Sequence, residues 1–288
     1  MSSISCPECT QPMRDDMERC PHCYRPCLYP NVTATRRQEE VEALNRRYDE
    51  AIALAVADGC EPMLRDFEKA VSSSEAVICR SFGELQRLSY SEDEIYATFY
   101  QRVDAGLRLA GGDAYDTLRS MADTALFGEQ NKRHVRFASL TLNGRGMPHY
   151  GDCSLLLREE MIAHRTSVLE ENSVMFMHRH NIGAGNDYKI PSGYRATWLE
   201  RGRLAVAKTR HPKTLHPSTF PTDLQRSGAD ERKDVFIEAH VWGSLTIRSI
   251  QQVRVTAWRG APPSQAELEV VEQKLNQYGV IFEAPRVP

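Results

Sequence analysis

The cysteines of this 288-residue chain are concentrated at one end, and they constrain its fold more than any other feature. Five of the eight fall within the first 27 residues, and four of these five form two Cys-x-x-Cys pairs with ten residues between them. Thiolates spaced in this way on two tight turns can face one ion and supply the four soft ligands of a closed tetrahedral site. We therefore predict a zinc ribbon over residues 1–30 whose ligands are Cys6, Cys9, Cys20 and Cys23.

The predicted zinc has a structural role, because four thiolates leave no open coordination position for a substrate. A segment of this length buries too little apolar surface to fold alone, so metal binding supplies its folding energy. Cys27 and His22 are expected to lie outside the ligand set, although Cys27 could replace Cys23 in a shifted register. Cysteines clustered in this way are typical of a reduced compartment, which favours a cytoplasmic protein.

The overall composition is that of an ordinary globular protein. The chain is 41% hydrophobic and 26% charged, close to the averages for globular domains, which excludes a disordered or low-complexity protein. No uncharged apolar run approaches the roughly 18–20 residues of a membrane-spanning helix, and the first residues lack the pattern of a secretory signal. We therefore expect no membrane partner. The net charge of −3 neither favours nor excludes nucleic acid as a partner.

Residues 31–128 show mainly helical periodicity and are predicted to form a helical region. Thr35 and Gln38 have the spacing of a capping box at the start of a helix, and so do Ser91 and Glu94. Four helices are expected, over about residues 35–59, 62–70, 91–111 and 113–126.

The residue pattern of 129–288 is typical of a β-rich domain. Ser264 and Glu267 form a third capping box, which predicts a helix near the end of the chain. Short strands with irregular connections indicate an α+β fold around a split, mostly antiparallel sheet. Stretches rich in β-branched residues, with Gly and Pro between them, predict strands at about residues 135–142, 153–157, 166–169, 195–198, 204–208, 235–241 and 252–258.

Two polar residues inside one predicted strand are the main chemical signal, since the common phosphate-loop, dinucleotide, zincin and serine-hydrolase motifs are absent from the sequence. Glu238 and His240 share one face of the strand, whereas Ile237, Ala239 and Val241 share the other. Burying a carboxylate there is costly unless it has a partner or a task. Glu238 is therefore either a functional residue or the partner of an arginine in the core.

A basic stretch lies between residues 176 and 216, where eight Lys and Arg residues stand against two acidic ones. Three aromatic residues are interspersed among them. Basic side chains together with stacking rings suit an anionic ligand with rings, such as a dinucleotide or a nucleic-acid strand. An exposed basic loop without a ligand explains the same pattern equally well.

Motifs between residues 126 and 256 follow one another in a definite order. They are Arg136-Phe-Ala-Ser-Leu140, His149-Tyr-Gly-Asp152, Leu155-Leu-Leu-Arg158, Arg165-Thr-Ser167, Glu171-Asn-Ser173 and Asp234-Val-Phe-Ile-Glu238-Ala-His-Val-Trp-Gly243. In order and spacing they resemble the core of bacterial ADP-ribosyltransferase-like toxin domains. In those domains a strand with Tyr-Gly precedes a strand with Arg and Thr or Ser, and a late strand carries the catalytic Glu.

The resemblance implies that residues 129–288 form a catalytic domain of this class, with NAD as its substrate. Glu238 is then the catalytic residue, whose carboxylate stabilises the oxocarbenium-like transition state on the ribose. Tyr150 is expected to stack on the nicotinamide ring. The other residues implied to bind NAD or hold the acceptor are Arg136, Ser167, Asn172, Ser173, Arg195 and Lys208. His134 and His149 are alternatives to Arg136 for gripping NAD.

The implied function is that of a toxin or phage-defence effector that moves ADP-ribose from NAD to an RNA, DNA or protein acceptor, with an antitoxin protein as a further expected partner. Arginine-specific members carry a second acidic residue two positions before the catalytic Glu, where this chain has Phe236, so arginine is not the expected acceptor. Two alternatives stay open. One is a non-enzymatic zinc-ribbon module that binds nucleic acid, and the other is an NAD glycohydrolase in which water replaces the acceptor.

Overall fold

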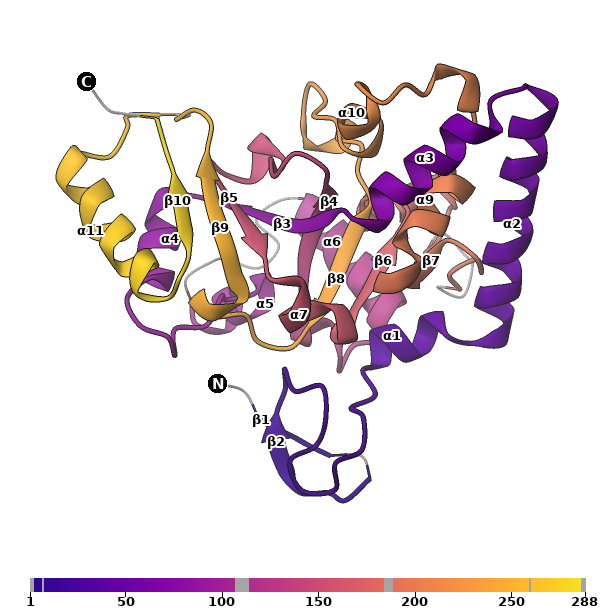
Figure 1. Ribbon diagram of the computed structural model, residues 1–288. Helices are drawn as coiled ribbons and strands as arrows, with labels where there is room; N and C mark the ends of the chain where they lie inside the picture. The colour runs from indigo at the N-terminus through magenta and orange to yellow at the C-terminus, as the bar shows by residue number, and fades with distance from the viewer. Residues whose placement is uncertain (1–2, 7, 107–113, 184–188, 259, 286–288) are drawn as a thin grey trace.

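A computed structural model of the chain describes residues 3–6, 8–106, 114–183, 189–258 and 260–285. An α+β body is built around a sheet of eight strands, and a small two-stranded ribbon projects from one side of it (Figure 1). Within the described residues, no helix is both long enough and apolar enough to cross a membrane.

The eight strands form one mixed sheet in the order β10–β9–β5–β3–β4–β8–β6–β7. β10 runs parallel to β9, and the other neighbours in this sheet pair antiparallel. The ribbon contains the antiparallel pair of β1 and β2. The strands are β1 Ser3–Ser5, β2 Pro12–Arg14, β3 Glu75–Arg80, β4 Val135–Thr141, β5 Cys153–Leu157, β6 Thr166–Leu169, β7 Arg195–Thr197, β8 Glu238–Trp242, β9 Ile250–Val255 and β10 Ile281–Glu283.

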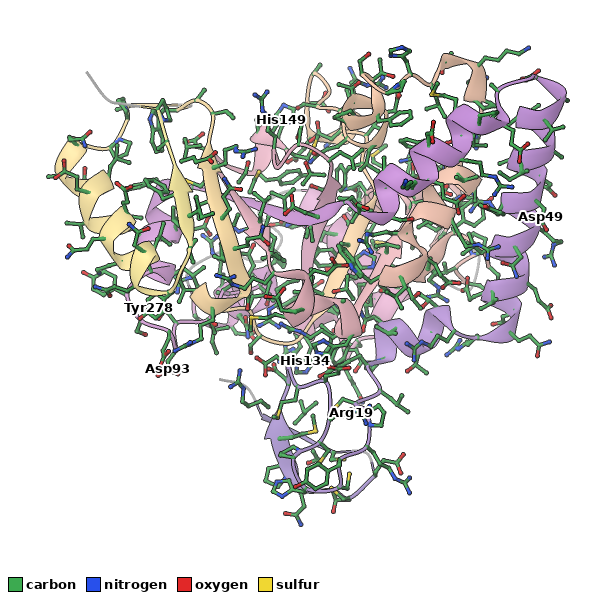
Figure 2. All side chains as sticks on the ribbon, viewed as in Figure 1. Arg19, Asp49, Asp93, His134, His149 and Tyr278 are labelled. Atoms are coloured by element: carbon green, nitrogen blue, oxygen red, sulfur yellow. The ribbon has the colours of Figure 1, made fainter. Side chains whose placement is uncertain are left out.

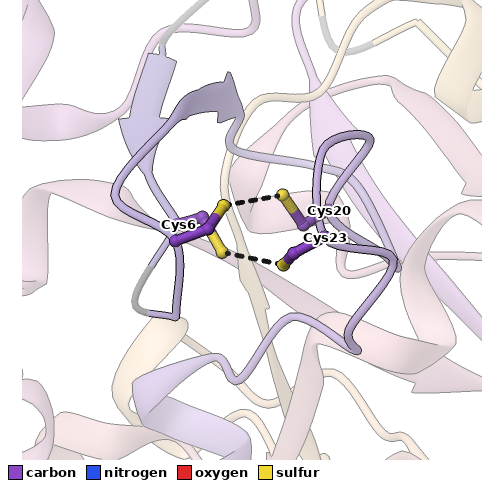
Figure 3. A group of neighbouring side chains, drawn as sticks. Cys6, Cys20 and Cys23 are labelled. Carbon is purple, nitrogen blue, oxygen red and sulfur yellow. Dashed lines mark hydrogen bonds between the residues drawn. The ribbon is translucent and has the colours of Figure 1, made fainter.

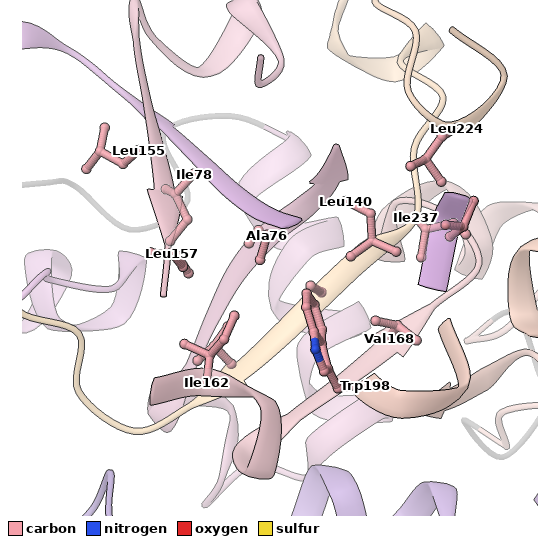
Figure 4. Close-up of a cluster of buried hydrophobic side chains, with 14 of the residues drawn as sticks. Ala76, Ile78, Leu140, Leu155, Leu157, Ile162, Val168, Trp198, Leu224 and Ile237 are labelled. Carbon is pink, nitrogen blue, oxygen red and sulfur yellow. The ribbon is translucent and has the colours of Figure 1, made fainter. Parts of the chain in front are cut away.

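Helices cover both faces of this sheet. Apolar side chains of α2, α3, α9 and α10 join the main core, which is drawn in part in Figure 4. Those of α6 and α8 form a second cluster. Val168 and Leu169 of β6 belong to different clusters, as expected for successive strand residues. The helices are α1 Pro30–Thr35, α2 Gln38–Ala57, α3 Glu61–Ser72, α4 Phe82–Leu88, α5 Phe99–Asp104, α6 Ala114–Phe127, α7 Glu159–Ile162, α8 Ser173–Arg179, α9 Arg201–Lys208, α10 Phe220–Leu224 and α11 Gln265–Gln277.

The α+β class and most of the predicted strands are confirmed, but the sheet differs from the expected split, mostly antiparallel one. The eight strands form one sheet, and this sheet is mixed because β10, which was not predicted, pairs parallel with β9 at its edge. The middle of the sheet also contains β3, from a stretch that was predicted to be helical. β3 is a short apolar run buried in its interior, and such a run has no periodicity that separates strand from helix.

Other local predictions were also wrong. The predicted strand at 204–208 is part of helix α9, because Leu204, Ala205 and Val206 pack into the core from a helix that contacts α2 and α3. Thr35 does not cap α2, whose N-cap is Arg37. The helix expected from Ser91 begins at Phe99, behind a capping box of Thr98 and Gln101. The predicted glycine end of that helix, at 111–112, lies outside the described residues. The Ser264–Glu267 box is confirmed.

The ribbon is docked against the end of β8 rather than tethered beside the body. Ser244 Oγ donates to Asp15 Oδ2 at 3.0 Å, and His164 Nε2 lies 3.1 Å from the carbonyl oxygen of Asp16. The hydroxyl of Tyr29 donates to the carbonyl of Met17. Asp15 is only 1% exposed, so the docked surface excludes water.

Two glycines allow a matched test of this docking. Gly243 and Gly128 have φ of +80° and +79°, but a Cβ at Gly243 would lie 2.2 Å from the carbonyl oxygen of Asp15, whereas one at Gly128 meets nothing within 4 Å. We expect Gly128→Ala to lower the free energy of unfolding by about 1–2 kcal/mol through backbone strain. Gly243→Ala is expected to cost a further ~1–3 kcal/mol, because the ribbon must move.

Denaturant unfolding of the two variants measures this difference, and limited proteolysis reports whether the ribbon of Gly243→Ala becomes accessible. Equal losses of stability in both variants, with an equally protected ribbon, would contradict the docked arrangement.

Candidate functional site

Four cysteine sulfurs meet at the centre of the ribbon (Figure 3). Cys6 Sγ lies 3.7 Å from Cys23 Sγ, and Cys9 Sγ lies 3.6 Å from Cys20 Sγ. All four sulfurs lie within 4.8 Å of one another. Metal–sulfur bonds of about 2.3 Å in a tetrahedron place the sulfurs about 3.8 Å apart. The cluster therefore has the dimensions of a structural metal site, and the four predicted ligands are the four that meet.

The two Cys-x-x-Cys turns have the same backbone hydrogen bonds. In the first, Cys6 N donates to Gln11 O at 2.9 Å, and Thr10 N donates back to Cys6 O at 2.9 Å. In the second, Cys20 N donates to Arg25 O and Tyr24 N donates to Cys20 O. Thr10 and Tyr24 both have a positive φ, which closes each turn and brings its two thiols to one side. Each pair is thus preorganised to contribute two ligands.

Two further residues of the ribbon stay outside the cluster, as predicted. The sulfur of Cys27 lies 3.7 Å from that of Met13, and His22 Nε2 lies 3.2 Å from the carbonyl oxygen of Pro12. Neither side chain joins the group of four ligands.

A cavity of about 140 Å³ lies in the body where β3 and β4 part. The two strands pair only between residues 75–77 and 139–141. Beyond this point β3 pairs with β5 and β4 pairs with β8. The cavity is lined by residues 78–80 of one strand and 135–138 of the other, together with α5, α6 and the start of α8. A cavity of about 150 Å³ can hold benzene, so this volume suits one aromatic ring.

Glu238 lines this cavity and is 4% exposed. Its Oε1 lies 2.8 Å from His240 Nε2, so the two side chains share one face of β8 as predicted. Ile237, Ala239 and Val241 fill the main core from the other face. The His240 ring is fixed edge-on against Phe127 and Phe137. The carboxylate is therefore oriented by a histidine, and among the residues that the structure describes no arginine forms an ion pair with it.

Arg136 on β4 is the second charged residue of the cavity wall, and it is 1% exposed. Its Nη1 donates to the carbonyl of His134 at 2.9 Å, and its Nη2 donates to Gln101 Oε1 at 3.4 Å. Burial lowers its pKa to about 10, and the charge of Asp15 partly opposes this shift. Among the described residues no carboxylate forms an ion pair with Arg136, and Nε has no hydrogen-bond partner. A buried guanidinium in this state is suited to an anionic ligand.

The two histidines considered as alternatives to Arg136 do not line the cavity. His134 stacks on Trp242 with ring centroids 5.3 Å apart. His149 Nδ1 lies 3.0 Å from Asp234 Oδ1. Figure 2 shows His134 on the side of the ribbon and His149 on the opposite side of the molecule. Of the three candidates, Arg136 is the one that lines the cavity with Glu238.

The cavity is also lined by three more of the predicted residues, Tyr150, Asn172 and Ser173. Tyr150 belongs to the short turn of 3₁₀ helix Pro148–Tyr150. Asn172 caps α8, accepting hydrogen bonds from the backbone N–H groups of Val174 and Met175. A ring and two small polar residues thus face the same hollow as Glu238.

Ser167, Arg195 and Lys208 lie elsewhere. Ser167 Oγ is 3.3 Å from Asn31 Nδ2, and Arg195 forms an ion pair with the buried Glu40. Lys208 Nζ donates to the carbonyl of Phe236 at 3.3 Å, and burial lowers its pKa to about 8. The structure therefore does not bring these three side chains to the cavity.

The basic stretch uses much of its charge inside the chain. Arg179 pairs with Glu170 and Glu171, and Trp198 is buried with its indole N–H on Glu159. Further ion pairs link Arg195 to Glu40, Arg201 to Glu159 and Lys213 to Asp58. The stretch is therefore largely a set of tertiary contacts rather than a free basic surface.

The sequence analysis did not identify several charged residues that line the cavity. Asp123 of α6 and Arg119 one turn before it share the wall with Glu238, and so does Arg80 of β3. Arg80 lies over the Tyr96 ring at 4.6 Å, and burial lowers its pKa to about 10. Nothing in the local sequence pattern marks them, because α6 and β3 come from a region that the resemblance did not cover.

A comparison with protein-family models finds no family that matches this chain, and a comparison with curated proteins finds no matching relative. The functional argument therefore rests on the site itself.

Proposed function

We propose that this protein is an NAD-dependent ADP-ribosyltransferase that moves ADP-ribose to a nucleic-acid or protein acceptor. The observation that carries the proposal is the oriented carboxylate of Glu238 in a ring-sized cavity whose wall also holds the buried guanidinium of Arg136. The sequence resemblance implies Glu238 as the catalytic residue and Arg136, His134 or His149 as the residue that grips NAD.

Glu238 acts on the ribose that carries nicotinamide. When the bond between nicotinamide and C1′ breaks, positive charge develops on the ribose in an oxocarbenium-like state. A fixed carboxylate that accepts a hydrogen bond from the 2′-hydroxyl stabilises that charge more than it stabilises the ground state. His240 keeps the carboxylate in place, so little reorganisation is needed during the reaction.

The other cavity residues account for substrate binding. Arg136 pairs with the pyrophosphate, and Arg80 and Arg119 add positive charge along the same wall. Tyr150 supplies an aromatic surface for the nicotinamide ring, for which the volume of the cavity is sufficient.

The biological role proposed is that of a toxin or phage-defence effector, with a neutralising antitoxin protein as a partner, and it rests on the sequence resemblance alone. The ion pairs that residues 176–216 form with acidic residues of the chain use much of the basic charge of this stretch, so protein and nucleic acid are equal candidates for the acceptor.

We further propose that the ion of the cysteine cluster is zinc, in a structural role. Four thiolates in a tetrahedron are the ligand set and geometry that zinc favours.

Nicotinamide release tests the main proposal. The purified protein is expected to release nicotinamide from NAD, and Glu238→Gln is expected to reduce kcat by about 10²–10³-fold, because the amide cannot stabilise the cationic ribose. Glu159→Gln is the matched control, since Glu159 does not line the cavity and should leave kcat unchanged. Thermal unfolding of both variants checks that they fold.

The fate of the ADP-ribose distinguishes the alternatives. Label that is transferred to RNA, DNA or protein supports a transferase, whereas free ADP-ribose alone indicates a glycohydrolase. If the wild-type protein releases no nicotinamide but binds nucleic acid with a steep salt dependence, the non-enzymatic binding module replaces the proposal.

Metal analysis tests the zinc site. We expect one zinc ion per chain in the wild-type protein and in Cys27→Ser, because Cys27 lies outside the cluster. Cys9→Ser should lose the zinc and make the ribbon sensitive to protease, since metal binding supplies most of its folding energy. Loss of zinc from Cys27→Ser with retention in Cys9→Ser would show that the ligand set is wrong.

A further inference from the structure

The cavity contains a second buried carboxyl group, which the proposed transfer has not yet used. Asp123 of α6 lines the same cavity as Glu238 and is 1% exposed. Its Oδ2 accepts a hydrogen bond of 2.7 Å from the hydroxyl of Tyr100 on α5. Within the described part of the chain, its Oδ1 is buried and has no hydrogen-bond partner. A buried carboxyl oxygen without a partner is costly in a purely structural role.

Charged groups from every side of Asp123 act on its protonation. Burial raises its pKa to about 7, and the charge of Glu238 on β8 adds to the increase. The hydrogen bond from Tyr100 lowers the pKa of Asp123, and so do the positive charges of Arg119 on α6 and Lys132 just before β4. Together they do not cancel the effect of burial. Lys132 is itself engaged, since its Nζ donates to Ser120, Thr124 and Glu129.

The two carboxyl groups of the cavity are held in different ways, and this suits them to different tasks. The carboxylate of Glu238 is hydrogen-bonded to His240, and in the proposed reaction it also accepts a hydrogen bond from the 2′-hydroxyl of the ribose. Asp123 is bound through one oxygen only. Burial, followed by the charge of Asp123, raises the pKa of Tyr100, so the phenol stays protonated and keeps donating to Oδ2. Oδ1 is therefore the oxygen that can receive a proton.

We propose that Asp123 is the general base that takes the proton of the acceptor, with Tyr100 as its positioning residue; this inference rests on the proposed transferase function. The bond between C1′ and nicotinamide breaks, and its electron pair leaves with nicotinamide. A lone pair of the acceptor's hydroxyl or amine forms the new bond to C1′. The proton of that group passes to Asp123 and returns to solvent after the product leaves.

The pH dependence of the reaction tests this assignment. We expect kcat/KM of the wild-type protein for the transfer of ADP-ribose to rise with pH through about 7, because Asp123 must be ionised to act as a base. Tyr100→Phe keeps the ring but removes the hydrogen bond that lowers the pKa of Asp123, so the rise should move to higher pH. Asp123→Asn should lose about 10²–10⁴-fold in rate and the rise itself.

Chemical rescue separates a base from a structural residue. In Asp123→Ala, added formate can occupy the space left by the side chain and accept the proton. Formate should therefore raise the rate of this variant by about tenfold or more, whereas the rate of Glu238→Gln should not change. Melting temperatures and NAD binding check that each variant folds.

The inference is overturned if Asp123→Asn keeps a rate within about threefold of wild type with the same pH profile. It is also overturned if formate rescues nothing and Tyr100→Phe leaves the profile in place. In both cases a large loss in Glu238→Gln would leave the transferase proposal standing.

Discussion

The site depends on the position of β8, a strand buried along its whole length between β4 and β6. Three apolar side chains fix one face of the strand in the main core, which forces Glu238 and His240 to the other face. Because both neighbours are hydrogen-bonded to β8, a slip of one residue would reverse the faces and bury apolar groups in the cavity. The register of the sheet thus places the carboxylate.

The end of β8 is held by groups from other parts of the chain. Arg165 is fully buried, and its Nη1 donates to the carbonyls of Trp242 and Ser244. Asn31 of α1 uses its amide to reach the carbonyls of Arg165 and His240 and the hydroxyl of Ser167. The Arg-Thr-Ser motif therefore holds the end of β8, and α1 connects this motif to the ribbon.

The sequence was most informative where a pattern has one physical cause. The four-cysteine cluster follows from ligand spacing, the faces of β8 follow from alternation, and the Ser264 cap follows from its box. The approach of Asp123, Arg80 and Arg119 to Glu238 depends on how helices pack over a sheet, which no local pattern encodes. Arg195 shows the converse, since its basic context could not reveal that the buried Glu40, 155 positions earlier, pairs with it.

The contacts that complete the site span almost the entire chain. Asp15 and Ser244 are 229 positions apart, and Asn31 and His240 are 209 apart. Contacts of such high sequence separation slow folding, because long loops must close before they form. During synthesis from the N-terminus, the early segments emerge long before the strand that carries Glu238. A nascent chain of this protein therefore has no assembled site until β8, the strand that carries Glu238, has been synthesised.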